Sequence, residues 1–240
     1  MAEPSAKNPW GACARGAARQ ALRSPITRIA ALVAAGLFGL LVALPLPLGD
    51  RTAALHEAAA SCQLLLVVML GLHTTLSVRG GPRASPIGSG LESSAAVVGR
   101  WAIAALALIA LAAIQLLVLQ CLTVFVGCQT LVRVLTHSLA ATLVVLAWAV
   151  FLGRRLGPLP GALALLILFL GASAWAEADQ TLPSLAFLPD LALLGPVGHG
   201  LRGPPLPALL GYAALQALFP LALSAVLASI DATRGRRQRI

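Results

Sequence analysis

The chain of 240 residues is 59% hydrophobic and 10% charged, has a mean hydropathy of +0.90 and carries a formal net charge of +9. A soluble domain normally contains about 25% charged residues, so this composition excludes an ordinary water-soluble protein. The basic residues form no patch with interleaved aromatic residues, which argues against nucleic acid as a partner.

Residues 1–28 are the first predicted element, a cytoplasmic segment that contains a short amphipathic helix. Arg15, Arg19 and Arg23 recur every four residues, so they share one helical face while alanines occupy the other. We expect this helix to lie in the headgroup layer of a membrane, with its arginines against anionic lipid. The alternative is an ordinary basic flank without a helix of its own.

Six long apolar blocks follow, each close to the roughly 20 residues that a helix needs to cross about 30 Å of hydrocarbon. Lipid offers no partners to backbone groups and the blocks lack the alternation of barrel strands, so helices are predicted. The first block is too long for a signal-peptide core, and we expect it to be retained. The predicted fold class is an all-α polytopic membrane protein with six transmembrane helices in residues 29–230. The blocks cover about 29–48, 58–76, 101–125, 134–152, 159–176 and 206–230.

The basic residues predict the orientation of these spans. If the N-terminus is cytoplasmic and the six spans alternate, fourteen of the seventeen Lys and Arg residues lie on the cytoplasmic side. Only Arg51, Arg133 and Arg202 then lie outside. This asymmetry follows the positive-inside rule, so both termini are predicted to be cytoplasmic, with residues 231–240 as a basic tail.

Residues 77–100, between the second and third blocks, are long for a connector between neighbouring helices. Glycines and prolines interrupt the first half, whereas "GLESSAAVVGRW" is compatible with a helix that has Glu92 in its first turn. One interpretation is a short helix parallel to the membrane, with Leu91, Ala95 and Val98 on its apolar face. The other is a loop that runs into an early start of the third span.

Residues 177–205 form the second long connection, on the outer side. This segment is apolar but contains five prolines, so we expect one or two short interfacial or re-entrant pieces.

Residues that could carry out chemistry are sparse. Ser173 in "GASAW" and His199 in "VGHGLRG" faintly resemble the serine and histidine of rhomboid intramembrane proteases, but no upstream residue is placed to form an oxyanion hole. The four histidines and four cysteines lack the spacing of a metal site, and no phosphate-binding P-loop occurs. We therefore expect no catalytic residue, no metal and no cofactor bound by this chain.

Four stretches of the sequence carry a family resemblance. These are "ALRSPITRIAALV" before the first span, "VVGRW" at Val97–Trp101, "LPDLALLGPVGHG" in the outer segment and "RGRRQRI" at the tail. Together with the span layout, they make the chain resemble the permease subunits of type-2 ABC exporters. The heme-exporter permeases of cytochrome c assembly are a related possibility.

The resemblance implies a membrane-spanning exporter subunit of a bacterial inner membrane, without catalysis of its own. A separate ABC ATPase subunit would bind ATP, and a second copy or a paralogue would complete a dimer. The ATPase would contact the cytoplasmic segment 77–100, with Arg83, Glu92, Val98 and Arg100 as candidate coupling residues. The alternative is a non-transporting assembly or accessory subunit of a membrane complex, and an intramembrane serine hydrolase is a distant third.

Overall fold

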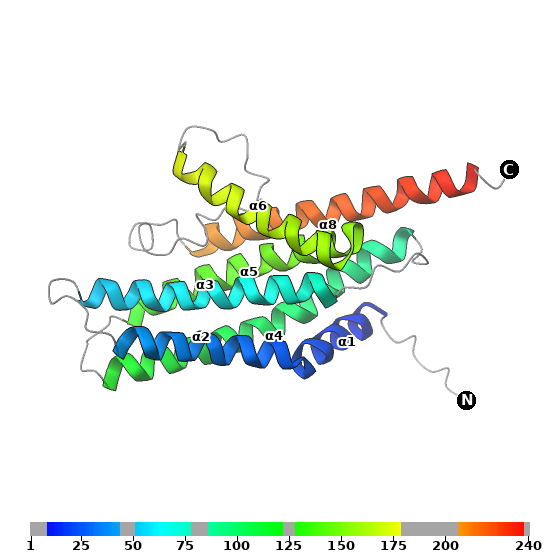
Figure 1. Cartoon of the computed structure of the whole chain (residues 1–240). Helices are drawn as coiled ribbons and strands as arrows, with labels where there is room; N and C mark the ends of the chain where they lie inside the picture. Colours follow the sequence, from blue (N-terminus) through cyan, green and yellow to red (C-terminus); the bar gives the residue numbers. More distant parts are fainter. Residues whose placement is uncertain (1–8, 44–50, 78–85, 122–127, 179–205, 238–240) are drawn as a thin grey trace, which may run out of the picture.

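The computed structural model describes residues 9–43, 51–77, 86–121, 128–178 and 206–237, which are almost entirely helical (Figure 1). This part of the chain contains seven helices, and the prediction of an all-α fold is confirmed. They are α1 (Pro9–Arg23), α2 (Pro25–Ala43), α3 (Arg51–Ser77), α4 (Pro86–Cys121), α5 (Cys128–Leu156), α6 (Pro158–Ala178) and α8 (Leu206–Arg237).

Each predicted apolar block corresponds to one long helix. Successive long helices reverse direction, and the start of α1 and the end of α8 point toward the same end of the bundle (Figure 1). Four helical stretches within the described residues are long and apolar enough to cross a membrane: Pro25–Ala43, Glu57–Ser77, Ser93–Cys121 and Leu131–Leu156. Two shorter apolar stretches, Pro158–Leu168 and Ala213–Leu227, come from α6 and α8. The chain therefore has the helices of a multi-pass membrane protein.

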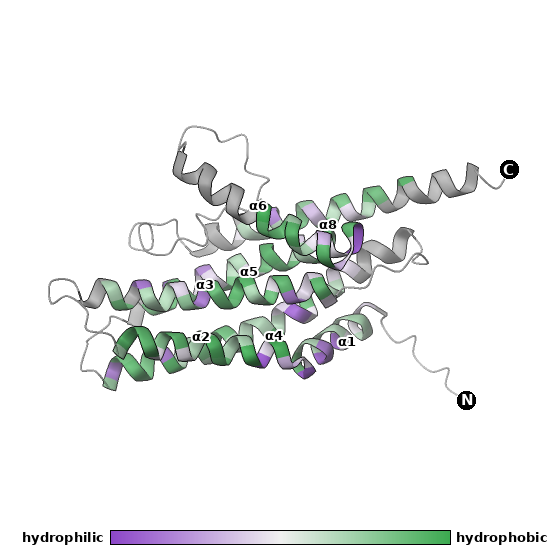
Figure 2. Ribbon diagram, in the orientation of Figure 1, coloured by the Kyte–Doolittle hydropathy of each residue, from purple (hydrophilic) through white to green (hydrophobic). Residues whose placement is uncertain are grey.

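Helix α5 occupies the centre of the bundle. It packs against α3, α4, α6 and α8, and 72% of its apolar window is buried, compared with 22% for α2. Its middle turns contribute Leu146, Ala147, Ala149 and Val150 to the main hydrophobic core. On α2 the large side chain of Leu32 is 72% exposed, and hydrophobic residues predominate along α2 and along the coloured part of α4 (Figure 2). Such outward-facing apolar surface suits lipid rather than water as the surrounding solvent.

A tight turn joins α5 to α6. Gly157, between the two helices, has a φ of 88°, a left-handed conformation that glycine adopts without a steric penalty. Pro158 then begins α6, where its fixed φ suits the first helical position. The amide of Gly161 donates to the carbonyl of Gly157 at 3.0 Å. This turn brings the basic end of α5, with Arg154 and Arg155, to the end of the bundle where α1 lies.

The predicted amphipathic N-terminal helix is confirmed as α1. Its alanine face, however, contacts another helix of the bundle. Arg15, Arg19 and Arg23 are exposed, as their spacing predicts. The alanine face packs against α4 instead of facing lipid.

Residues 86–100 distinguish the two interpretations of the connection between the second and third apolar blocks. They are the first turns of α4, which continues without interruption to Cys121. The structure therefore has the early start of the third span and not a separate short helix. At the other end of the chain α8 extends to Arg237, so most of the predicted tail is helical. Segment 177–205, which was predicted to lie on the outer side, is outside the described residues except for its first two residues.

Candidate functional site

Helix α1 is fastened to the first half of α4 by close backbone contact and by two hydrogen bonds. A Cβ added at Gly99 would overlap the carbonyl oxygen of Ala14, so only glycine lets the two helices approach this closely. Before this crossing, the indole Nε1 of Trp10 donates to the hydroxyl of Ser94 at 3.1 Å. After it, Arg100 reaches the side chain of Gln20. The N-terminal helix α1 therefore packs on α4 at the "VVGR" element of the sequence.

Arg100 is a buried cation that ties three helices together. Its side chain is only 7% exposed. Nη1 donates to the hydroxyl of Ser77 at 2.6 Å and to the carbonyl of Thr74 at 3.4 Å, both on α3. Nη2 donates to Oε1 of Gln20 on α1 at 3.3 Å. All these acceptors are neutral, so none of them compensates the charge of the guanidinium.

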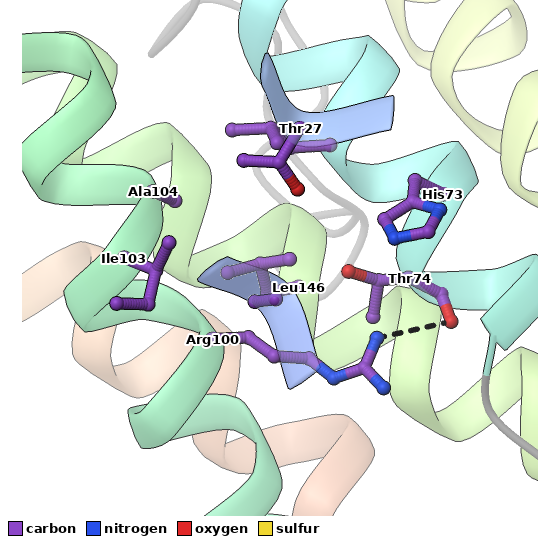
Figure 3. A pocket seen from close by; sticks show the side chains of 9 residues that line it. Thr27, His73, Thr74, Arg100, Ile103, Ala104 and Leu146 are labelled. Atoms are coloured by element: carbon purple, nitrogen blue, oxygen red, sulfur yellow. Dashed lines mark hydrogen bonds between the residues drawn. The ribbon is translucent and has the colours of Figure 1, made fainter. Parts of the chain in front are cut away.

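A small cavity lies beside Arg100, between α1, α2, α3, α4 and α5 (Figure 3). Its space for the centre of a water-sized sphere is about 10 Å³, which is room for about one water molecule. Thr27, His73 and Arg100 line it together with Thr74, and Ala21 lines it from α1. Three polar atoms of these residues are buried without a hydrogen-bond partner: Thr27 Oγ1, His73 Nδ1 and Arg100 Nε. The rest of the lining is apolar, from Leu70, Ile103, Ala104 and Leu146. Three residues that each carry an unpaired buried polar atom therefore meet at one small, mainly apolar cavity.

Further polar contacts join the neighbouring helices to the same end of α4. Nη1 of Arg154, at the end of α5, donates to the hydroxyl of Ser93 at 2.8 Å, and Ser93 is only 1% exposed. The indole Nε1 of Trp101 donates to the carbonyl of Leu139 on α5 at 3.1 Å. The first half of α4 is thus tied to α1, α3 and α5 at once.

The sequence matches no protein-family model and no curated protein.

The four candidate coupling residues have different positions. Val98 is 41% exposed on the surface of the bundle, whereas the side chain of Arg100 is buried between helices. Glu92 lies on α4, but its side chain is outside the described residues, as is all of Arg83. Val98 and Arg100 thus lie on one helical turn of α4 and face different surroundings, and the coupling role of all four residues stays a prediction.

The residues considered for other chemistry do not form a described site. Ser173 lies on α6, but its side chain is outside the described residues, as is all of His199. His137 is buried on α5, with Nδ1 2.9 Å from the carbonyl oxygen of Arg133. No group of three or more His, Cys, Asp or Glu side chains that could hold a metal occurs within the described ranges.

A second polar contact lies deeper in the bundle. Nε2 of Gln63 on α3 donates to Oε1 of Gln115 on α4 at 2.8 Å, and Nε2 of Gln115 donates to the carbonyl of Ala59 at 3.0 Å. Both glutamine side chains are 0% exposed. The sequence marks them as polar residues within apolar blocks, but their pairing follows only from how α3 and α4 pack.

Proposed function

We propose that this chain is the membrane-spanning permease subunit of an ATP-driven ABC exporter, working with a separate ATPase subunit. In this proposal α2, α3, α4, α5, α6 and α8 cross a bacterial inner membrane six times, and both chain ends lie in the cytoplasm. The ATPase binds ATP and contacts the chain around the start of α4. Two copies of the chain, or the chain and a paralogue, form the transport pathway.

The gathering of arginines at one end of the bundle supports this orientation. Arg15, Arg19 and Arg23 on α1 and Arg155 at the end of α5 are exposed, and all belong to the end where α1 begins and α8 finishes. The positive-inside rule assigns such an end to the cytoplasm. The start of α4 belongs to the same end, where a cytoplasmic ATPase could reach it.

The main observation in support of the proposal is that hydrogen bonds connect the first half of α4 to α1, α3 and α5. Arg100 bonds Gln20 and Ser77, and Ser93 accepts from Arg154. A force applied near Val98 would therefore move several helices together rather than bend one. That is the mechanical requirement for a subunit whose conformation is set by an external ATPase.

The central position of α5 supports a dimer. Because α5 fills the middle of the single-chain bundle, a transport pathway fits better between two copies than inside one. The same filled centre also favours the alternative, a non-transporting accessory subunit of a membrane complex. The two candidates differ in whether an ATPase binds and responds to this chain.

Replacing the exposed Val98 by glutamate is expected to weaken binding of the ATPase about tenfold, because a charge in an apolar contact loses at least about 1.4 kcal/mol. The measurement is purification of the tagged full chain from its native membranes, followed by assay of co-purified ATP hydrolysis in reconstituted vesicles. Val132→Glu is the matched control, since Val132 is 48% exposed and lies at the opposite end of the bundle. Equal loss in both variants, or no ATPase with the unaltered chain, contradicts the proposal.

Topology gives a separate prediction. In a background without the four native cysteines, a cysteine introduced as Ser89→Cys is expected to be protected from an impermeant thiol reagent added to intact cells. A cysteine introduced as Ser184→Cys is expected to react. Reaction at position 89 from outside would reverse the orientation and remove the start of α4 from the reach of a cytoplasmic ATPase.

A further inference from the structure

The α1–α2 corner, residues 19–29, carries arginines and large apolar side chains side by side on its surface. Its exposed members of these two kinds, in chain order, are Arg19, Leu22, Arg23, Ile26, Arg28 and Ile29. Water disfavours the exposed apolar side chains, and hydrocarbon disfavours the arginines. The mixture is typical of a segment at the boundary between headgroups and hydrocarbon, where arginines extend toward water and apolar side chains toward the acyl chains.

The length of α2 places the α1–α2 corner at this boundary. Helix α2 has 19 residues and is one of the candidate spans. That is about 29 Å of helix for a hydrocarbon core of about 30 Å, so a spanning α2 has to begin at the hydrocarbon edge. Arg23 precedes Pro25 by two residues and Arg19 precedes it by six, which is at most about 9 Å along α1. Both arginines are therefore within reach of the headgroup layer.

Helix α4 determines which face of α1 stays exposed. The backbone of α1 at Ala14 contacts Gly99 of α4, and the indole of Trp10 donates to Ser94. The alanine face of α1 is thus occupied by protein, whereas Arg19 and Arg23 remain exposed. Figure 2 shows hydrophilic residues on α1, next to the largely hydrophobic α2. The exposed face is consequently the basic one.

The charge and the apolar side chains of the α1–α2 corner together favour anionic phospholipid. Residues 9–43 contain four arginines and no Asp or Glu, so these two helices do not balance their own charge. Anionic headgroups strengthen binding by about fivefold for each arginine near the membrane surface. An acidic protein surface would match the arginines but not the exposed leucine and isoleucines, whereas a phospholipid offers both a charged headgroup and acyl chains.

We propose that the α1–α2 corner is a binding surface for anionic phospholipid of the adjacent leaflet. Its three arginines lie at the headgroups and its three large apolar side chains lie against the acyl chains. Because α1 also packs on α4, lipid bound at the corner holds the N-terminal helix and the first half of α4 at the membrane surface. The proposal depends on α2 spanning a membrane and not on an ATPase, so it can fail or hold separately from the exporter assignment.

The test measures which phospholipid gathers beside α1 in a bilayer. The purified full chain keeps Cys13, which is exposed on α1, and its other three cysteines are replaced by alanine. A fluorescent donor on Cys13 transfers energy to a trace of acyl-labelled phosphatidylglycerol, or of acyl-labelled phosphatidylcholine, in vesicles of phosphatidylcholine. We expect a local enrichment of phosphatidylglycerol of about fivefold. Salt at about 1 M is expected to remove most of it, because the screening length falls to about 3 Å.

Variants of the arginines assign the enrichment to the α1–α2 corner. Combined Arg19→Gln, Arg23→Gln and Arg28→Gln is expected to abolish it, whereas lysine at the same three positions is expected to keep it, because lysine retains the charge. Arg155→Gln is the matched control, since it removes an exposed cation of α5 from the same end of the bundle.

The melting temperature in neutral detergent checks that each variant is folded. If the triple glutamine variant does not fold, Arg23→Gln alone decides, and it is expected to lower the enrichment. Equal energy transfer to the two lipids by the unaltered chain overturns the proposal and leaves the arginines to an acidic protein surface. Enrichment that is undiminished in the glutamine variants overturns it as well.

Discussion

Replacing Gly99 by valine is expected to release α1 from α4 and to destabilise the bundle by about 3 kcal/mol. The new Cβ would overlap the carbonyl oxygen of Ala14, and it would lie 3.0 Å from the carbonyl carbon of Ala14 and 3.1 Å from the amide nitrogen of Ala18. These are backbone atoms of a helix, so they cannot turn aside as the end of a flexible side chain would. The helices must separate, and the Trp10–Ser94 and Gln20–Arg100 hydrogen bonds would be lost with them.

Two measurements check this result: the melting temperature in detergent and the rate of trypsin cleavage after Arg15 and Arg19, which becomes faster once α1 detaches. Gly39→Val is the matched control on α2, because no atom outside the neighbouring backbone lies within 4 Å of its added Cβ. The control is expected to melt close to the unaltered chain. If Gly99→Val and Gly39→Val melt and cleave alike, α1 does not pack on α4 in the way described.

The sequence predicts the helices well because their signals are local. Apolar length is sufficient to predict the long apolar helices, and the four-residue spacing of Arg15, Arg19 and Arg23 predicts α1. The early start of α4 has a more ambiguous signal, because a proline such as Pro86 can also mark a break in a helix. Proline is in fact favoured at the first helical position, and α4, like α1, α2 and α6, begins at one.

Local signals in the sequence do not predict which residues come together at the site. Gly99 permits close approach, but the sequence does not say which backbone approaches it. Thr27, His73 and Arg100 lie on three helices, at separations of 46 and 27 residues along the chain, so only tertiary packing brings them to one cavity. The family resemblance of "VVGRW" makes Arg100 a candidate coupling residue, but it does not predict that packing against α1 and α3 buries the side chain.

A leucine in place of Gln115 is expected to destabilise the bundle by about 2 kcal/mol, because it leaves the amide of Gln63 buried without a partner. Gln63 is 0% exposed, and its Nε2 donates to Gln115 at 2.8 Å. Its Oε1 already lacks a partner, so the single substitution would leave the whole amide group unsatisfied in an apolar core. The control Gln120→Leu changes an exposed glutamine on the same helix and is expected to shift stability by less than about 0.5 kcal/mol.

The double variant Gln63→Leu with Gln115→Leu provides the sharper result. Removing both amides replaces a polar contact by an apolar one of similar size, so stability is expected to return to within about 1 kcal/mol of the unaltered chain. The double variant should therefore be more stable than the Gln115→Leu single variant, which is the reverse of what independent substitutions would give. Melting temperatures of the four proteins complete the cycle. Additive losses would mean that the two glutamines do not pair and that α3 and α4 are held together at this depth by apolar packing alone.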